Sequence, residues 1–126
     1  MPLKLSVEVR NIQLDTLAAL ASGGFIDYYD GEQPESPDST PTGTRLCRLL
    51  LGFPAFGPAS NGVLTANQIG DDTDAYATGV ASWFRVSRSD ESPLFDGEIG
   101  PSGITINTTA ILIHAKVTLD ELTYSL

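Results

Sequence analysis

Turn-forming residues divide this sequence into short segments, and that division limits the folds open to it. Asp30-Gly31, Asn61-Gly62, Asp71–Asp74 and Ser89–Pro93 follow one another along the chain. Turn signals about every 8–12 residues, with short alternating runs between them, are typical of antiparallel sandwiches and barrels. We therefore predict a single mainly β domain over residues 1–126, an antiparallel β-sandwich or barrel-like fold with one short N-terminal helix.

The strand with the clearest alternation is expected at Gly79–Arg88. Every second side chain from Val80 onward is expected on one face of this strand, and every second side chain from Ala81 onward on the other face. Leu94–Ile99 is its expected hairpin partner across Ser89–Pro93. Further strands are expected at Phe25–Tyr29, Arg45–Leu51, Gly62–Ala66, Ile104–Asn107, Ile111–Leu119 and Leu122–Leu126. Residues 32–44 carry three prolines and no apolar side chain, which predicts a surface loop.

Two patterns follow each other at the N-terminus. Residues 1–10 alternate apolar Leu and Val with polar side chains, which predicts either an extended arm or the first strand of the domain's own sheet. Residues 11–22 then repeat apolar side chains at helical spacing, with Ile12 and Leu20 on the same stripe as the other leucines. We expect Asn11 to cap this short helix and Gly23-Gly24 to end it.

The charge balance excludes several partners. A formal net charge of -9 repels phosphate backbones and anionic membrane surfaces, so neither nucleic acid nor a membrane is expected as a partner. The start of the sequence has no secretory signal pattern. The one cysteine, Cys47, cannot form an internal disulfide, which fits synthesis in a reducing cytoplasm, and burial is the ordinary state of a free cysteine.

No enzyme signature is present, and we expect no catalytic activity. The one histidine, His114, falls within an alternating run, where a structural or surface strand position is the ordinary interpretation. A G-x-S-x-G motif is absent, and nothing around Cys47 marks a reactive thiol.

A tight acidic cluster is the one candidate for metal binding. Asp71, Asp72 and Asp74 offer hard oxygen ligands of the kind that Ca²⁺ takes, but they lack the full calcium-loop pattern. Aspartates are also common in turns because they bond local N–H groups. We expect no metal and no other cofactor.

Acidic residues also gather in two longer stretches, at residues 27–38 and 90–98. They form either a solvated surface or an acidic face that docks on a basic partner. Aromatic side chains suggest a third hypothesis, a carbohydrate platform, although most belong to a core in a sandwich. The candidates for that platform are Tyr28, Tyr29, Phe53, Phe56, Trp83 and Phe84.

Four segments resemble a group of small proteins encoded among the structural genes of tailed bacteriophages and prophages, and the resemblance as a whole covers most of the chain, roughly from Arg10 to the C-terminus. They consist of turn and core residues rather than a chemical signature. The segments are Gly23–Gly31, Pro54–Gly62, Ala77–Val86 and Phe95–Gly100.

The resemblance implies a β-rich virion structural protein, made in the host cytoplasm. Small size and acidity look most similar to a head decoration (cement) protein, bound to the outer capsid. A tail, neck or fibre-associated component is the alternative, and a carbohydrate-binding module is the second alternative. The expected partners are the major capsid protein or other virion proteins, with homo-oligomerisation on the particle. The residues expected to contact a partner are Leu3, Leu5, Val7, Asp30, Glu32 and Glu35.

Overall fold

The computed structural model describes residues 4–99, 109–119 and 122–125. Within these ranges the chain is mainly β with antiparallel pairing and one helix, which confirms the predicted fold class. The elements are α1 (Val7–Ala21), β1 (Phe25–Tyr29), β2 (Arg45–Leu50), β3 (Val63–Thr65), β4 (Gly79–Val80), β5 (Trp83–Ser87), β6 (Pro93–Glu98), β7 (Ala110–Ile111) and β8 (Thr123–Ser125).

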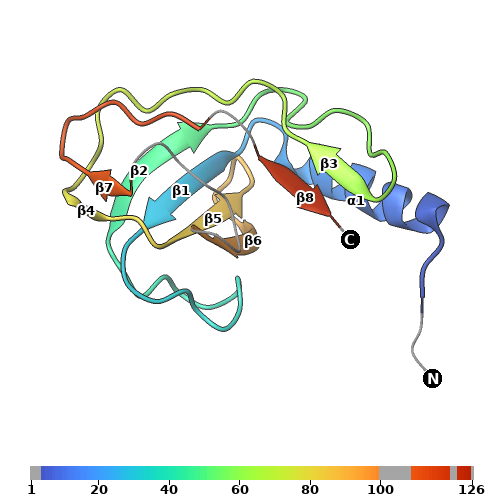
Figure 1. The fold of residues 1–126 in the computed structure, drawn as a ribbon, viewed down its shortest axis with the longest axis horizontal. Coiled ribbons are helices and arrows are strands. Elements are labelled where there is room, and N and C mark those ends of the chain that lie inside the picture. Colours follow the sequence, from blue (N-terminus) through green and yellow to red (C-terminus); the bar gives the residue numbers. More distant parts are fainter. Residues whose placement is uncertain (1–3, 100–108, 120–121, 126) are drawn as a thin grey trace.

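A four-stranded antiparallel sheet in the order β2-β1-β5-β6 forms the centre of the molecule (Figure 1). The predicted strand at Phe25–Tyr29 is confirmed as β1, and it pairs with both β2 and β5. The predicted hairpin is confirmed as β5–β6, in which Arg85 lies opposite Asp96. No regular element is assigned to the loop at residues 32–44, as its composition predicts.

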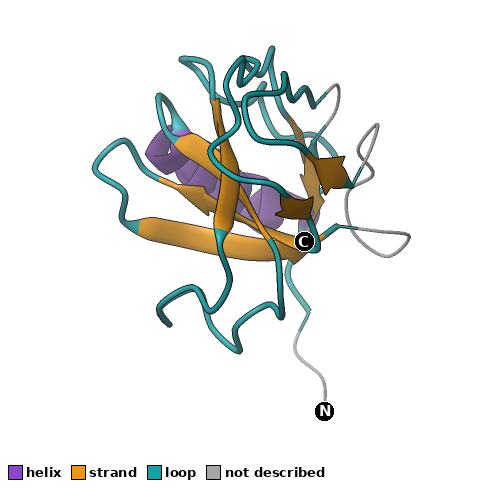
Figure 2. Cartoon of the chain, turned by 90° about the vertical axis from the view of Figure 1, so that its left-hand side faces the viewer, coloured by secondary structure: helices purple, strands orange, loops and turns teal. Residues whose placement is uncertain are grey.

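Two small sheets lie on opposite sides of this centre, β4–β7 on one side and β3–β8 on the other (Figure 1). Strand β8 confirms the terminal strand expected after Leu122. Figure 2 shows α1 running behind the strands.

Two strand predictions are wrong in their extent. The run Gly79–Arg88 is split because Ala81 N–H donates to Thr109 while Ser82 N–H donates to Tyr29, so the chain changes partner there. The run expected at Ile111–Leu119 ends at Ile111, because the chain turns at His114, whose φ is 69°. The strand expected at Ile104–Asn107 lies outside the described residues.

The helix begins earlier than predicted. Ser6, not Asn11, is the N-cap, and its hydroxyl accepts a hydrogen bond from Val9 N–H at 3.1 Å. Residues 7–10 are therefore helical, and the predictions of a first strand or an extended arm are wrong for them. The predicted stop is confirmed at Gly23, whose φ of 74° favours glycine.

The core lies between α1 and one face of the central sheet. Leu14 and Ala21 of the helix belong to the same buried cluster as side chains from β1, β2 and β5, and Leu94 and Phe95 of β6 pack against it. Alternation along β1 and β5 sends Ile26, Phe84 and Val86 into this cluster, while Asp27 and Arg85 emerge on the opposite face.

Candidate functional site

The helix α1 and the residues just before it expose several apolar side chains to solvent. Of the predicted partner-contacting residues, Leu5 is 50% exposed and Val7 is 43% exposed, while Leu3 lies outside the described residues. Ile12 is 59% exposed and Leu20 is also open to solvent, although the sequence placed both on the buried stripe. That placement is wrong because the helix carries two apolar faces rather than one.

The inner face of α1 is the one that the fold uses. Leu14 and Ala21 are buried, and Leu17 and Ala18 pack against the core beside them. A strand of the β3–β8 sheet and β6 contact the helix. Val9 and Ile12 lie on the side turned away from these contacts, whereas Val7, seven residues before Leu14, lies on the same side of the helix as Leu14, because residues three, four and seven apart share one face.

Loop hydrogen bonds fix the helix against the body. Asn11 Oδ1 accepts from Gly62 N–H at 3.0 Å, and Asp15 Oδ1 accepts from Ala59 N–H at 2.8 Å. Asn11 therefore has a different role from the helix cap that its sequence position suggested. The two bonds hold the helix from one flank and leave its outer surface open.

Of the three acidic residues predicted to contact a partner, Asp30 has a structural role, whereas Glu32 and Glu35 are exposed. Asp30 is half-buried, and its Oδ1 accepts from Thr44 N–H at 2.6 Å, while its carbonyl accepts from Trp83 Nε1 at 3.1 Å. It therefore closes the base of the loop between β1 and β2. Glu32 and Glu35 are exposed on that loop, which leaves them accessible to a partner.

Each of the two acidic stretches has one member whose side chain is buried, Asp27 in the first and Asp96 in the second, whereas most of the other members are exposed. Asp27 and Asp96 belong to a row of alternating charges that crosses the four strands, Arg48–Asp27–Arg85–Asp96. Arg48 Nε lies 2.7 Å from Asp27 Oδ1, and Arg85 Nε lies 2.6 Å from Asp96 Oδ1. A charged residue inside an otherwise aromatic or apolar strand is the sequence signal that could have indicated this row.

The row ends at the surface in Glu91. Its Oε1 accepts from Arg48 Nη2 at 2.8 Å, and this contact lowers the pKa of Glu91. The hydrogen bonds that Arg48 donates to Asp27, and then the one it donates to Glu91, outweigh desolvation and raise the pKa of Arg48. Arg48 also lies over the Phe25 ring at 4.2 Å, so its guanidinium is held by charge and by an aromatic face together. These contacts make the row a structural feature of the sheet.

Each of the three candidate metal-ligating side chains, Asp71, Asp72 and Asp74, has its own hydrogen-bond or ion-pair partner. Asp72 accepts from Arg48 N–H and from Asp74 N–H, whereas Asp71 pairs with Lys116 at 3.4 Å. Asp74 Oδ1 lies 2.6 Å from His114 Nδ1. Within the described ranges, no group of three or more metal-ligating side chains comes together.

The two residues considered for catalysis, Cys47 and His114, lie in different settings. Cys47 is buried, as predicted, and burial followed by the nearby Asp72 raises the pKa of its thiol to about 12. His114 lies in an exposed turn rather than in the predicted strand, with Asp74 as its side-chain partner.

The aromatic residues proposed for a carbohydrate platform lie mostly inside. Tyr28 and Trp83 are fully buried, and the Trp83 ring stacks on Tyr29 at 4.4 Å. Phe56 and Phe84 are buried as well. These rings cannot contact a sugar, so the platform prediction is wrong for them. Phe53, at 87% exposed, is the one member of the set that is open to solvent.

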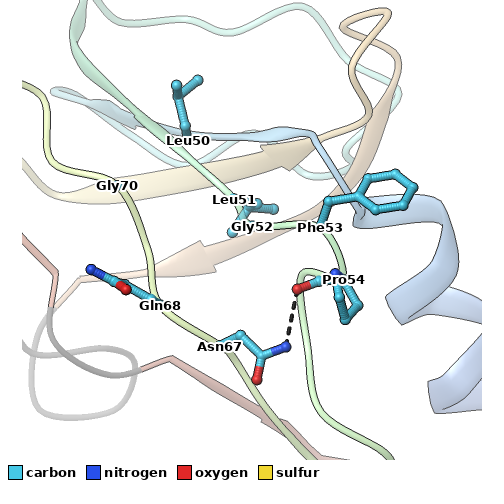
Figure 3. Close-up of a pocket in the computed structure, with 8 residues that line it drawn as sticks. All are labelled: Leu50, Leu51, Gly52, Phe53, Pro54, Asn67, Gln68 and Gly70. Carbon is cyan, nitrogen blue, oxygen red and sulfur yellow. Dashed lines mark hydrogen bonds between the residues drawn. The ribbon is translucent and has the colours of Figure 1, made fainter.

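Phe53 lies at the edge of a shallow groove of about 460 Å³ (Figure 3). Its ring points out of the groove toward the end of α1, while Asn67 Nδ2 donates to the Pro54 carbonyl at 3.0 Å inside it. The groove carries no charged side chain. Its lining residues are Leu50, Leu51, Gly52, Phe53, Pro54, Asn67, Gln68 and Gly70.

Comparison with known proteins gives no match: no family model, no curated protein and no solved structure is similar to this chain. Among the described residues, no helix has the length and apolar character that crossing a membrane requires.

Proposed function

We propose that this protein is a structural component of a tailed-phage particle, and specifically a head decoration protein that binds the outer capsid in many copies. The observation that carries the proposal is the exposed apolar surface of α1, where Val9 and Ile12 are open to solvent, with Leu5 exposed just before the helix. Contiguous exposed apolar side chains mark sites of protein–protein contact. The resemblance of the turn and core segments to phage structural proteins supplies the class of partner.

Binding of this kind would stabilise the assembled shell by mass action. A protein that binds the native lattice and not its dissociated subunits shifts the equilibrium toward the lattice. Many copies bound side by side add avidity, so each individual contact can be weak. The exposed acidic loop with Glu32 and Glu35 is suited to a basic neighbouring surface on the shell.

Quantitative mass spectrometry of purified particles, separated into heads and tails, tests the proposal. We expect the protein in heads at a copy number comparable to that of the major capsid protein. Particles that lack it should lose infectivity at a lower temperature than complete particles. Recovery in tails alone, or at a few copies per particle, would refute the decoration role and favour the tail, neck or fibre alternative. Absence from particles would refute both.

A further inference from the structure

The turn that leads into β3 carries an asparagine followed by a glycine, Asn61-Gly62, and lies beside α1 (Figure 1). The N–H of Ser60 donates to the Val63 carbonyl, and the N–H of Val63 donates back to the Ser60 carbonyl, both at 3.0 Å. Between them Asn61 has a φ of 51° and Gly62 a φ of 74°. Two positive φ values inside such a pair of bonds define a two-residue type I′ turn. Asn61 is exposed on this turn, whereas Gly62 is buried.

An asparagine before a glycine is the arrangement that loses its side-chain amide most readily, because glycine has no side chain to crowd the reacting nitrogen. The glycine nitrogen gives up its proton to solvent base and attacks the asparagine Cγ. The new N–Cγ bond closes a cyclic imide, the bond from Cγ to the side-chain nitrogen breaks, and ammonia leaves with a proton from solvent. Water then opens the imide at one carbonyl or the other, which leaves an aspartate or an isoaspartate.

A side chain of α1 holds the nitrogen that would have to react. Asn11 Oδ1 accepts a hydrogen bond from Gly62 N–H at 3.0 Å. While this bond is made, the N–H is directed at the helix and away from solvent base. The nitrogen also cannot turn toward the Asn61 side chain without breaking it. The bond to Asn11 therefore opposes both the loss of the proton and the attack.

We propose that Asn61 is a deamidation site and that Asn11 of α1 controls its rate. The reaction requires the bond between Gly62 and Asn11 to open, so its rate follows the fraction of molecules in which that bond is open. A hydrogen bond of ordinary net strength lowers that fraction by about fivefold. Removing the acceptor should therefore speed the reaction at Asn61 by about the same factor.

The modification would act back on the contact between this turn and the helix. Isoaspartate routes the main chain through the side-chain carbon, so it lengthens a turn whose two-residue length fits the bonds between Ser60 and Val63. The longer turn displaces Gly62 N–H from Asn11. Either product also adds a negative charge to a chain whose net charge is already -9. Docking of the helix and the chemical age of this turn are thus coupled.

Peptide mass spectrometry of the full chain, sampled over time in warm, mildly alkaline buffer, tests this inference. We expect Asn61 to convert more slowly in the folded wild type than in the same chain unfolded in urea. Asn11→Ala should convert Asn61 about fivefold faster than the wild type. Asn11→Asp keeps an oxygen acceptor at the same place, so this variant should convert no faster than the wild type.

Asp15→Ala is the matched control for a loosened helix. Asp15 Oδ1 accepts from Ala59 N–H at 2.8 Å, so this variant loses a bond of the same kind between α1 and the same loop. The bond from Gly62 to Asn11 remains, and Asn61 should convert at the wild-type rate. Asn67, which precedes Gln68, provides a reference within every sample, because the larger side chain after it crowds the attack.

Hydrogen exchange tests the same bond without any substitution, so it decides the matter even if a variant fails to fold. The Gly62 amide of the wild type should exchange more slowly than an exposed amide. A Gly62 amide that exchanges freely, or a folded wild type that converts Asn61 as fast as the unfolded chain, would overturn the inference. Equal rates in Asn11→Ala and the wild type, or in Asn11→Ala and Asp15→Ala, would overturn the role of Asn11.

Discussion

The buried pair Arg85–Asp96 offers the sharpest test of what holds the central sheet together. The two side chains are 8% and 2% exposed, and two parallel hydrogen bonds of 2.6 and 3.0 Å join them. Asp96→Ala would leave the Arg85 guanidinium buried without its partner. Breaking a buried pair in this way costs about 3–5 kcal/mol. For a domain of this size, that corresponds to a melting temperature about 10–20 °C lower.

Urea unfolding followed by Trp83 fluorescence measures the effect. Trp83 is the one tryptophan of the chain, is fully buried, and stacks on Tyr29, so its emission changes when the sheet opens. The matched control is Asp71→Ala, which removes the exposed Lys116 contact of 3.4 Å. An exposed pair of this kind contributes less than about 1 kcal/mol.

The double variant Arg85→Met with Asp96→Leu separates the cost of an unpaired charge from the value of the pair. Both charges are then gone, and apolar side chains fill the space, so most of the lost free energy of unfolding should return. If Asp96→Ala proves no more damaging than Asp71→Ala, the burial of the pair has no energetic consequence and the reasoning is refuted. A double variant as unstable as the single one would refute the unpaired-charge explanation specifically.

Three further predictions concern single side chains. The raised pKa of the Cys47 thiol stabilises the folded protein below pH ~9, and that stability is lost as the pH rises toward about 12. Urea unfolding across this range should show the free energy of unfolding decreasing, and the decrease should be smaller in Cys47→Ala. Tyr28→Phe should raise the free energy of unfolding by about 1 kcal/mol, because the buried Tyr28 hydroxyl has no hydrogen-bond partner among the described residues. Leu14→Ala should cost about 2–5 kcal/mol, whereas Ile12→Ala should change the free energy of unfolding by less than about 0.5 kcal/mol, as measured by urea unfolding of both.

Each of these has a result that contradicts it. Stability independent of pH above 9 would show that the Cys47 thiol ionises as freely in the folded as in the unfolded chain. A destabilised Tyr28→Phe would mean that the hydroxyl makes a needed bond. Equal losses in the two helix variants would mean that Ile12, like Leu14, is buried against the core.

Local patterns predicted the elements that local interactions determine. Phe25–Tyr29 is a short, mostly aromatic run that ends at the turn residues Asp30-Gly31, and Ser89–Pro93 is a short turn between two runs, so β1 and the β5–β6 hairpin were predictable. The break at Ala81 was not, because it depends on Thr109 and Tyr29, which are distant in sequence. Alternation alone does not say where a strand changes partner.

The charged row was hidden from the sequence for the same reason. Asp27 stands in an acidic stretch, so its sequence neighbours favoured a surface position, whereas its neighbours across the sheet are Arg48 and Arg85. The helix posed a different difficulty. Ile12 and Leu14 each fit an apolar stripe, and only the position of the sheet decides which stripe is buried.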